Sequence, residues 1–285
     1  MIRDFEVDDK EELVKIVSQG IYIDEQDIIN YITSEDIKII VFENEAGAIH
    51  GFSCLKKWDK SGRKGDVRTY VVPNARRKGI GTLLYNEIMR YEADIELTFI
   101  VTRIRVDQDD ATLFYKKLGY KKWYGMNNLY YNGSEQPKSD MRVVAYEDKY
   151  FEEYAEGLRQ SFYEMRKAHD FQPHLCCELN EQKREELLKN KDNIFLLISN
   201  ENFIASVKVK DNGFLDDIFV VPSYQGKGYG KIITQFGINK AIDKGVNSIE
   251  TSVVEWNTRA LNLYIGLGFD KVQNTHYYRL LKTEN

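Results

Sequence analysis

Three glycines within five residues mark the stretch whose spacing could bind a phosphate group. The stretch is Gln225-Gly226-Lys227-Gly228-Tyr229-Gly230, between the apolar run Ile218 to Val221 and a helix-like segment from Lys231 to Lys244. Glycine adopts backbone conformations closed to residues with a Cβ, so such a turn can aim several N–H groups at one point beside the positive end of the helix. We therefore expect a phosphate-binding turn here.

The spacing of this loop differs from two common nucleotide-binding loops. A Walker loop needs a glycine where Gln225 stands and a Ser or Thr where Ile232 stands. A dinucleotide-binding loop needs a third glycine three positions after Gly228, where the chain has Lys231. Taken alone, the six residues could also form an ordinary turn.

A second glycine loop argues against an ordinary turn. Arg76-Arg77-Lys78-Gly79-Ile80-Gly81 lies 149 positions earlier, the difference between 225 and 76. The same offset continues without a gap from Val71 to Tyr120, which indicates that one architecture is present twice. Other matching pairs are Pro73 with Pro222, Ala111 with Ala260, Tyr115 with Tyr264, Leu118 with Leu267, and Gly119 with Gly268.

The length of the chain agrees with a duplication, because 285 residues favour two domains. The polar segment 134–140 carries turn residues without apolar periodicity and is expected to be a linker. We therefore expect an N-terminal domain over residues 1–133 and a C-terminal domain over 141–285. The pairs Trp123-Tyr124 and Tyr130-Tyr131 are expected in the last strand of the first domain, and Tyr277-Tyr278 in that of the second.

Composition limits the classes of partner. The formal net charge is −5 and no apolar run is long enough to span a membrane, so we expect neither nucleic acid nor a membrane. The N-terminus lacks a signal-peptide pattern and three cysteines make no disulfide framework, so a cytoplasmic protein is expected. We expect a monomer with an internal pseudo-dimer, or a homodimer. Metal-capable side chains cluster without the spacing of a metal site, and we expect no metal; they are His169, His174, Cys176 and Cys177.

The order of the expected elements in each copy resembles the fold of the GNAT acyl-CoA N-acyltransferases. Both loops are similar to that family's pattern Gln/Arg-x-x-Gly-x-Gly/Ala. Asn257 to Tyr264, followed by Gly268-Phe269, resembles its second motif, Asn-x-x-Ala-x-x-x-Tyr-x-x-x-Gly-Phe. The resemblance implies an α/β (α+β) chain of two tandem GNAT folds, each with a mixed, mostly antiparallel central sheet flanked by helices.

The same resemblance implies acetyl-CoA as the co-substrate. In the second copy, a strand would lie along the pantetheine arm and the loop would hold the pyrophosphate. The residues concerned are Ile218, Phe219, Val220, Val221, Gln225, Gly226, Lys227, Gly228, Tyr229, Gly230, Lys231 and Asn257. The corresponding residues of the first copy are Val71, Val72, Arg76, Arg77, Lys78, Gly79, Ile80, Gly81 and Thr82.

Acyl transfer to an amine releases a thiolate that must be protonated. A phenol has a pKa of roughly 10 and a thiol of roughly 8.5, so a tyrosine remains protonated and can donate. Tyr264, which the resemblance places near the thioester, is the candidate general acid. It could instead be a core residue on the apolar helical face that holds Leu263 and Leu267. Asn257 could contact the pantetheine arm, cap the helix, or do both.

Two adjacent acids precede the second glycine loop. Asp216 and Asp217 are expected in a strand, where neighbouring side chains face opposite sides. The stretch resembles the Leu-Glu-Asp-Phe-Phe-Val strand of polyamine acetyltransferases, which implies that Asp216 takes the proton through water and Asp217 attracts the cationic amine. Asp is shorter than the Glu of that pattern, and the pair could also be two strand-edge acids without a task. Glu255, at the end of the next strand, is the other candidate base.

The first copy departs from this pattern. Val67 and Arg68 stand opposite the two acids, and Gln108 stands opposite Asn257, although Tyr115 is retained. We expect this copy to hold a CoA-type pyrophosphate and to have a structural or regulatory role.

The expected function is transfer of an acetyl group from acetyl-CoA to a primary amine, such as a small amine, a polyamine or an aminoglycoside-like acceptor. Direct attack in a ternary complex is expected, since the resemblance implies it and no activated Cys or Ser nucleophile suggests a covalent route. The alternatives are a protein or peptide amine acetyltransferase and a non-catalytic acyl-CoA-binding regulatory protein. Aminoacyl transfer would leave two CoA-type loops without a purpose. The acceptor would be selected by the segments Asp24–Ile32 and Tyr150–Asn190, whose composition does not identify it.

Overall fold

The structure is a computed structural model that divides into two units. Unit 1 comprises Met1–Tyr124 and Thr275–Asn285, and unit 2 comprises Gly125–Asn274. The expected helix at Asp24–Ile32 lies almost entirely outside the described residues, as do Gln108 and Cys177. The structure describes residues 1–20, 29, 32–34, 36–57, 64–91, 97, 99–107, 110–171, 174–176, 178–246 and 248–281.

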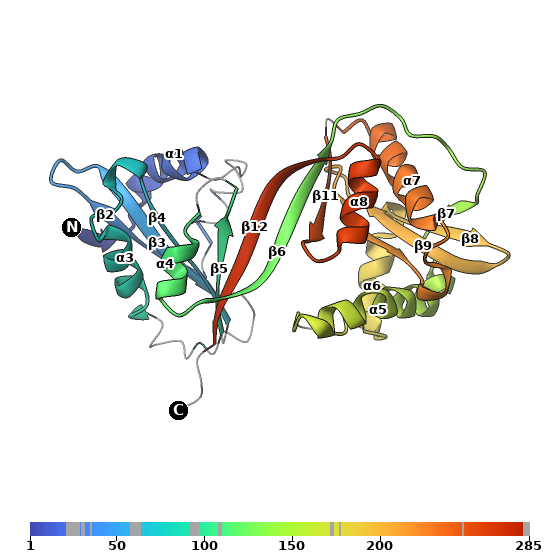
Figure 1. The fold of residues 1–285 in the computed structure, drawn as a ribbon, viewed down its shortest axis with the longest axis horizontal. Coiled ribbons are helices and arrows are strands. Elements are labelled where there is room, and N and C mark those ends of the chain that lie inside the picture. Colours follow the sequence, from blue (N-terminus) through green and yellow to red (C-terminus); the bar gives the residue numbers. More distant parts are fainter. Residues whose placement is uncertain are drawn as a thin grey trace. The chain divides into compact units, whose positions relative to one another are not determined.

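Unit 1 contains a mixed sheet with helices on both faces (Figure 1). Its elements are β1 (Ile2–Asp4), η1 (Val7–Asp9), α1 (Lys10–Gly20), β2 (Ile37–Glu43), β3 (Ile49–Lys57), β4 (Lys64–Val71), η2 (Pro73–Ala75), α3 (Ile80–Ile88), β5 (Phe99–Arg105) and α4 (Thr112–Lys117). Strands β1 to β4 pair antiparallel in chain order, whereas β4 and β5 pair in parallel. Strand β2 and strand β3 form the hairpin expected from the sequence, closed by the Asn44 N–H donating to the Ala48 carbonyl.

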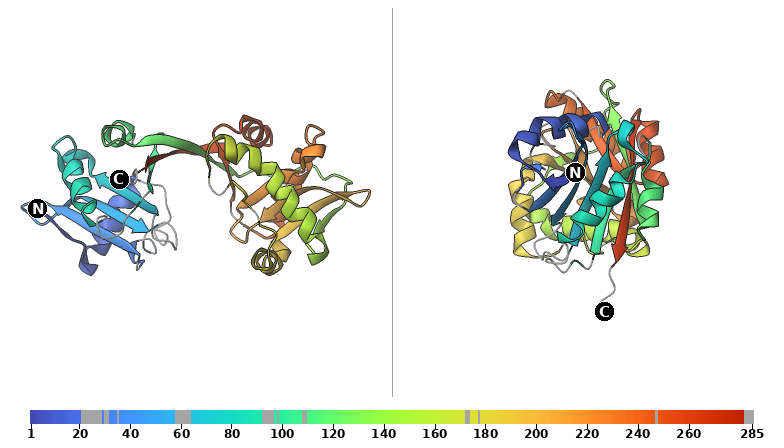
Figure 2. Two further views of the ribbon diagram at one scale, coloured as in Figure 1. Left: turned by 90° about the horizontal axis from the view of Figure 1, so that it is seen from below. Right: turned by 90° about the vertical axis from the view of Figure 1, so that its left-hand side faces the viewer.

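The alternation of side chains along β2 explains why both faces of this sheet are covered. Ile39 and Val41 pack in one apolar cluster with Leu13 of α1. Ile40, which points to the opposite face, packs in another cluster with Leu84 of α3. Figure 2 shows α1 and α3 on the two sides of the sheet.

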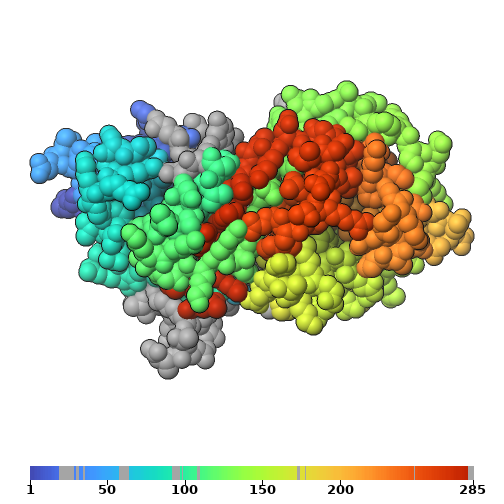
Figure 3. All heavy atoms as spheres, viewed as in Figure 1, coloured from blue at the N-terminus to red at the C-terminus, as the bar shows by residue number. Residues whose placement is uncertain are grey.

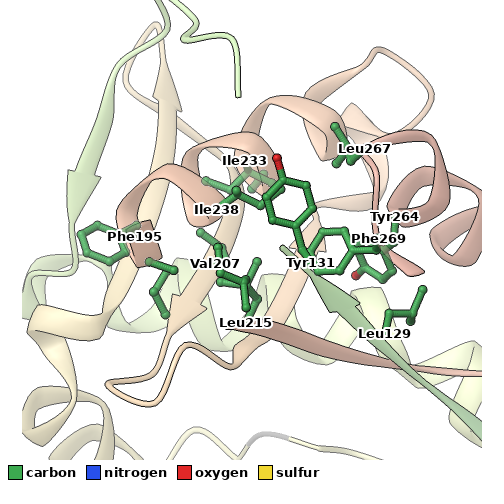
Figure 4. Close-up of a cluster of buried hydrophobic side chains, with 14 of the residues drawn as sticks. Leu129, Tyr131, Phe195, Val207, Leu215, Ile233, Ile238, Tyr264, Leu267 and Phe269 are labelled. Atoms are coloured by element: carbon green, nitrogen blue, oxygen red, sulfur yellow. The ribbon is translucent and has the colours of Figure 1, made fainter. Parts of the chain in front are cut away.

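The strands of unit 2 and the helices after its glycine loop follow the same order as in unit 1. Its elements are β7 (Val143–Ala145), η4 (Asp148–Tyr150), α5 (Phe151–Ala168), α6 (Glu181–Lys189), η5 (Lys191–Asn193), β8 (Ile194–Ser199), β9 (Asn202–Val209), β10 (Leu215–Val220), η6 (Pro222–Tyr224), α7 (Tyr229–Asp243), β11 (Ile249–Val254) and α8 (Thr258–Gly266). Strands β7, β8, β9 and β10 form an antiparallel sheet. Its apolar core includes Val207, Leu215 and Ile233, drawn in Figure 4.

The last strand of each copy pairs within the other copy's unit. Strand β6 (Lys121–Tyr131) runs from unit 1 into unit 2, where it pairs antiparallel with β11. Strand β12 (Asp270–Leu281) runs from unit 2 into unit 1, where it pairs antiparallel with β5. Leu280 pairs with Ile100, and the equivalent Tyr131, 149 positions earlier, pairs with Ile249. The two exchanged pairings therefore have the same register.

This exchange corrects the expectation that each copy keeps its own last strand. Tyr130-Tyr131 pairs in unit 2, and Tyr277-Tyr278 pairs in unit 1. The pattern of the sequence cannot distinguish the two arrangements, because β6 and β12 occupy equivalent positions of a repeat and offer the same register to either partner. Trp123-Tyr124 remains in unit 1, where the Tyr124 ring stacks on that of Tyr277 with centroids 4.3 Å apart.

The polar segment after β6 is held against α7. The Gln136 N–H donates to Asn239 Oδ1 at 2.7 Å, and Asn239 Nδ2 donates to the Gln136 carbonyl at 2.9 Å. Gln136 Nε2 also donates to the Leu267 carbonyl at 3.1 Å. Figure 3 shows this light-green segment as a band on the surface of unit 2. No helix in the described part of the chain is long and apolar enough to cross a membrane.

The exchange predicts a crossed pattern of destabilisation. Leu129 of β6 is fully buried in the core of unit 2, whereas its repeat equivalent, Tyr278 of β12, is buried in the core of unit 1. Truncating each to alanine should cost about 2–5 kcal/mol, since each leaves a cavity. Amide exchange followed by mass spectrometry should show faster exchange in α7 for Leu129→Ala and in α3 for Tyr278→Ala. The reverse assignment would contradict the exchange.

Candidate functional site

The two glycine loops share one local geometry. In unit 2, Gln225 Nε2 donates to the Val220 carbonyl at 3.0 Å, which ties the loop to the end of β10. In unit 1, Arg76 Nε donates to the Val71 carbonyl at 2.7 Å. Donors and acceptors are both related by the offset of 149. The repeat read from the sequence thus extends to individual hydrogen bonds.

The backbone conformations of the loops also correspond. Gly79 and Gly228 have φ of +81° and +88° and precede the first residues of α3 and α7. Gly226 has φ +81°, and its equivalent in the first loop, Arg77, is a rarer non-glycine case with φ +62°. Because the first N–H groups of a helix lack intrahelical acceptors, both loops end at a partial positive charge.

The space around the loops suits an anionic ligand that approaches the backbone. A Cβ added to Gly226 or Gly228 would meet no heavy atom within 4 Å. At Gly230, by contrast, it would approach Leu263 Cδ2 at 3.5 Å, and at Gly81 it would approach Phe114 Cε2 at 3.6 Å. The last glycine of each loop therefore packs against the next helix, while Gly226, Gly228 and Gly79 face open space. A pyrophosphate fits this arrangement.

A β-bulge interrupts β10 beside the two acids. Asp216 pairs with Lys208 and Phe219 with Ser206, so that both Asp217 and Ile218 lie opposite Val207. Asp217 has φ +44°, and its N–H donates to Asp216 Oδ1 at 3.0 Å. The bulge therefore changes the simple alternation of side chains expected for this strand.

The two carboxylates have different environments. Asp216 is ion-paired with Lys210, whose Nζ lies 2.7 Å from Oδ2, and its side chain is 39% exposed. Burial raises the pKa of Asp217 to about 6, and the negative charge of Asp216 contributes to the rise. Asp217 is therefore ionised near neutral pH and could accept a proton there.

Tyr264 lies in the core beside these acids. It is 5% exposed, and its ring packs against Phe269 with centroids 5.8 Å apart (Figure 4). Burial raises the pKa of Tyr264 well above its ordinary value, with a further contribution from the charge of Asp216, while a hydrogen bond with the Thr251 side chain lowers it. The phenol stays protonated at physiological pH. It is a core residue whose phenolic proton is retained.

Strands β10 and β11 meet only at their beginnings within the described residues. A parallel bridge joins Phe214 to Glu250, and no further ladder pair connects the two strands. Beyond the bridge, Thr251 Oγ1 donates to the Leu215 carbonyl at 2.9 Å. This side-chain bond holds the two strands together next to Asp216 and Tyr264.

The remaining candidate residues of the second copy lie at the end of β11 and in β10. Asn257 caps α8, because its Oδ1 accepts from the Ala260 N–H at 3.2 Å. Glu255 follows β11, where its N–H donates to the Gly125 carbonyl at 2.9 Å. The side chain of Phe219 is buried against Tyr154 and Phe203, so only its backbone could contact a ligand.

Two contacts of this region were not identified from the sequence. The imidazole of His169, at the end of α5, stacks on the indole of Trp256 with centroids 3.9 Å apart. Helix α5 also approaches β10 closely at Gly157, where a Cβ would lie 3.2 Å from Phe219 Cε2. Neither His169 nor Gly157 belongs to a periodic pattern, so only the tertiary structure reveals these two contacts.

The cysteine near the acids is not an activated nucleophile. Burial raises the pKa of the Cys176 thiol, and the charge of Asp217 adds to the effect. The thiol lies 3.8 Å from the Leu158 carbonyl oxygen. No group of three or more His, Cys, Asp or Glu side chains within the described ranges could hold a metal ion.

Family comparisons match both units. Residues 151–269 match the model of the acetyltransferase (GNAT) family, and residues 35–122 match that of an acetyltransferase (GNAT) domain. Together they cover most of the chain and place two GNAT domains in tandem.

Curated relatives include amine acetyltransferases. The chain is 39% identical over 66 residues to thialysine N-epsilon-acetyltransferase of Mus musculus, which covers 23% of this chain and 39% of that protein. It is 29% identical over 93 residues to L-ornithine N5-acetyltransferase NATA1 of Arabidopsis thaliana, which covers 32% of this chain and 41% of that protein. The chain thus spans about two fifths of the length of these relatives.

Solved structures share the fold over nearly the whole chain. A GCN5-related N-acetyltransferase from Sphaerobacter thermophilus has a TM-score of 0.73 at 14% identity, covering 99% of this chain and 95% of that one. A tandem GNAT protein from the clavulanic acid biosynthesis pathway has a TM-score of 0.61 at 13% identity, covering 100% and 99%. At this identity the likeness concerns the fold alone.

Proposed function

The chain belongs to the GNAT family of acetyltransferases, and from that premise we propose that unit 2 transfers an acetyl group from acetyl-CoA to the primary amine of a small molecule. The observation that carries the proposal is the convergence of Asp216, Asp217 and Tyr264 beside the bulge that precedes the loop Gln225–Gly230. These residues supply an acceptor for the amine's proton and a donor for the leaving thiolate.

The loop would hold the pyrophosphate of acetyl-CoA. The left-handed glycines Gly226 and Gly228 open the backbone to the ligand, and the N-terminus of α7 attracts its charge. Because β10 and β11 separate beyond Phe214 and Glu250, the backbone of Ile218 to Val221 would accompany the pantetheine arm. When bound, acetyl-CoA supplies the thioester that is cleaved. Unit 1 has the same loop geometry, and its binding of a CoA-type pyrophosphate remains a prediction.

The two aspartates would have different roles toward the acceptor amine. The resemblance to polyamine acetyltransferases assigned the base to Asp216, but its ion pair with Lys210 favours the reverse assignment. Asp217, with a pKa of about 6, would accept a proton from the bound ammonium, while Asp216 would attract its positive charge. Glu255 remains the second candidate base.

Tyr264 would protonate the thiolate as the carbon–sulfur bond breaks. The nitrogen lone pair forms the new carbon–nitrogen bond, and the electrons of the carbon–sulfur bond leave with the sulfur, which takes the phenolic proton. The nitrogen then loses its second proton, which restores the phenol. The bulge supports this step, because the Ile218 N–H lies where the regular ladder is interrupted and would donate to the carbonyl oxygen as it gains charge. Direct attack needs no enzyme nucleophile, which agrees with the raised pKa of Cys176.

A small cationic acceptor is favoured over a protein or peptide amine. Two carboxylates lie at the proposed reaction centre, and the partly matching relatives are named for thialysine and ornithine, whose side chains end in primary amines. A panel of such amino acids, polyamines, aminoglycosides and peptides, assayed by release of the CoA thiol, tests the proposal. Acetyl-CoA binding without turnover of any acceptor would favour the regulatory alternative.

Gly228→Val should raise the Kd of the second site for acetyl-CoA at least tenfold by calorimetry. Valine resists the left-handed conformation at φ +88°, at a cost of about 1–2 kcal/mol, so the loop and the start of α7 must shift. Gly245→Val is the matched control, because Gly245 has φ +71° and open space but lies at the other end of α7. Equal affinity in both variants would contradict the assignment of the loop.

Tyr264→Phe should lower kcat by roughly 10²-fold or more with little change in KM, because only the transition state needs the phenolic proton. The ring is retained, so packing against Phe269 is unchanged. Steady-state kinetics with the best acceptor of the panel measure the effect. An unchanged kcat would leave Tyr264 with a role in the core alone.

The pH profile should report Asp217. A base works in its ionised form, so kcat should fall as the pH drops through about 6. Asp217→Asn should remove this acidic limb and lower kcat by roughly 10²-fold or more. Asp216→Asn should retain the limb but move it to lower pH, because the charge of Asp216 helps to raise the pKa of Asp217. A limb that persists in Asp217→Asn would exclude Asp217 as the base.

A further inference from the structure

The repeat provides an internal comparison between the reaction centre of unit 2 and the equivalent positions of unit 1. Subtracting 149 relates Tyr264 to Tyr115 and Ile218 to Thr69. It also relates Asp217 to Arg68. The surroundings of these equivalent residues differ in two independent respects.

The first difference concerns the tyrosine and the strand next to it. The Thr69 N–H donates to the Tyr115 hydroxyl at 3.0 Å, and Tyr115 is 2% exposed. Strand β4 pairs with β3 without a register shift, from Lys57 opposite Gly65 to Gly51 opposite Val71. Unit 1 thus lacks the bulge of β10, and its tyrosine is bonded to the strand.

Unit 2 has no equivalent of this bond among its described residues. The groups that act on the Tyr264 hydroxyl there are the Thr251 side chain and Asp216, and the backbone of Ile218, which lies in the bulge of β10, is not among them. A backbone N–H engaged by a buried tyrosine is not available to a thioester carbonyl, and breaking the bond would leave a buried donor unsatisfied. The contact in unit 1 therefore occupies the group that unit 2 keeps for the acyl oxygen.

The second difference concerns charge. Asp66 is 2% exposed and receives two arginines: Arg103 Nη2 lies 2.6 Å from its Oδ2, and Arg68 Nε lies 3.3 Å from its Oδ1. Two guanidinium groups contact this one carboxylate. Where unit 2 holds Asp217, unit 1 holds an arginine, which cannot accept a proton from an ammonium group.

From these two differences we infer that unit 1 does not transfer acetyl groups, because Tyr115 occupies its acyl-oxygen donor and Arg68 replaces its base. All turnover belongs to unit 2. This inference goes beyond the proposed function, which concerns unit 2 alone, and it assigns Tyr115 a structural role that its position in the repeat would not suggest.

The test makes the same substitution, tyrosine to phenylalanine, separately in each unit of the full chain. Tyr115→Phe should leave kcat within about twofold of the wild type and lower Tm by several degrees, because the buried Thr69 N–H loses its acceptor. Tyr264→Phe should show the opposite pattern, a large loss of kcat with little change in Tm. A tenfold or larger loss of kcat in Tyr115→Phe at unchanged Tm would overturn the inference.

A second experiment inactivates unit 2 and measures whether any acetyl transfer remains. The double variant Asp217→Asn with Tyr264→Phe should release no CoA thiol with any amine of the panel, to below about 1% of the wild-type rate. Residual turnover that adding Tyr115→Phe removes would overturn the inference.

A third arm needs no turnover and so separates this inference from failure of the proposed function. Amide exchange of Thr69 should be slow in the wild type and at least roughly tenfold faster in Tyr115→Phe. Rapid exchange of Thr69 in the wild type would show that the N–H is available after all, and would overturn the inference even if no acceptor were found.

Discussion

The bulge in β10 is the constraint on which the proposed chemistry of unit 2 depends. A regular strand would direct neighbouring side chains to opposite faces and engage its N–H groups in the ladder. The extra residue turns the backbone of Asp217 into the left-handed region and interrupts the ladder at Ile218. One local irregularity thus gives two adjacent acids different surroundings, and in the proposed reaction it would free a backbone donor.

The surrounding packing holds this irregularity in place. Helix α5 lies against the strand at Gly157, where any side chain would press on Phe219. On the other side, the hydroxyl of Thr251 ties Leu215 to β11 just as the two strands separate. Strained backbone persists where its neighbours determine it on several sides, as they do here.

Much of this architecture could be predicted from residue patterns. The glycine loops, the hairpin of β2 and β3 and the repeat itself follow from local spacing, because turn residues and alternation act over a few positions. The bulge could not be predicted, because an aspartate at position 217 is equally compatible with a regular strand. Nor could the different surroundings of Asp216 and Asp217, which are an ion pair with Lys210 for the first and burial for the second. The strand with which each last strand pairs could not be predicted either, because both copies offer the same register.

That exchange of strands has a consequence for the order in which the chain is made. The edge of β5 is covered by residues 275–281, which are the last of the described chain to leave the ribosome. At ordinary rates of translation, roughly 8–30 s separate the emergence of Tyr131 from that of Leu281. The N-terminal unit therefore cannot complete its native pairing before residues 275–281 have been made. A premature stop before residue 275 would damage the part of the protein that was made first.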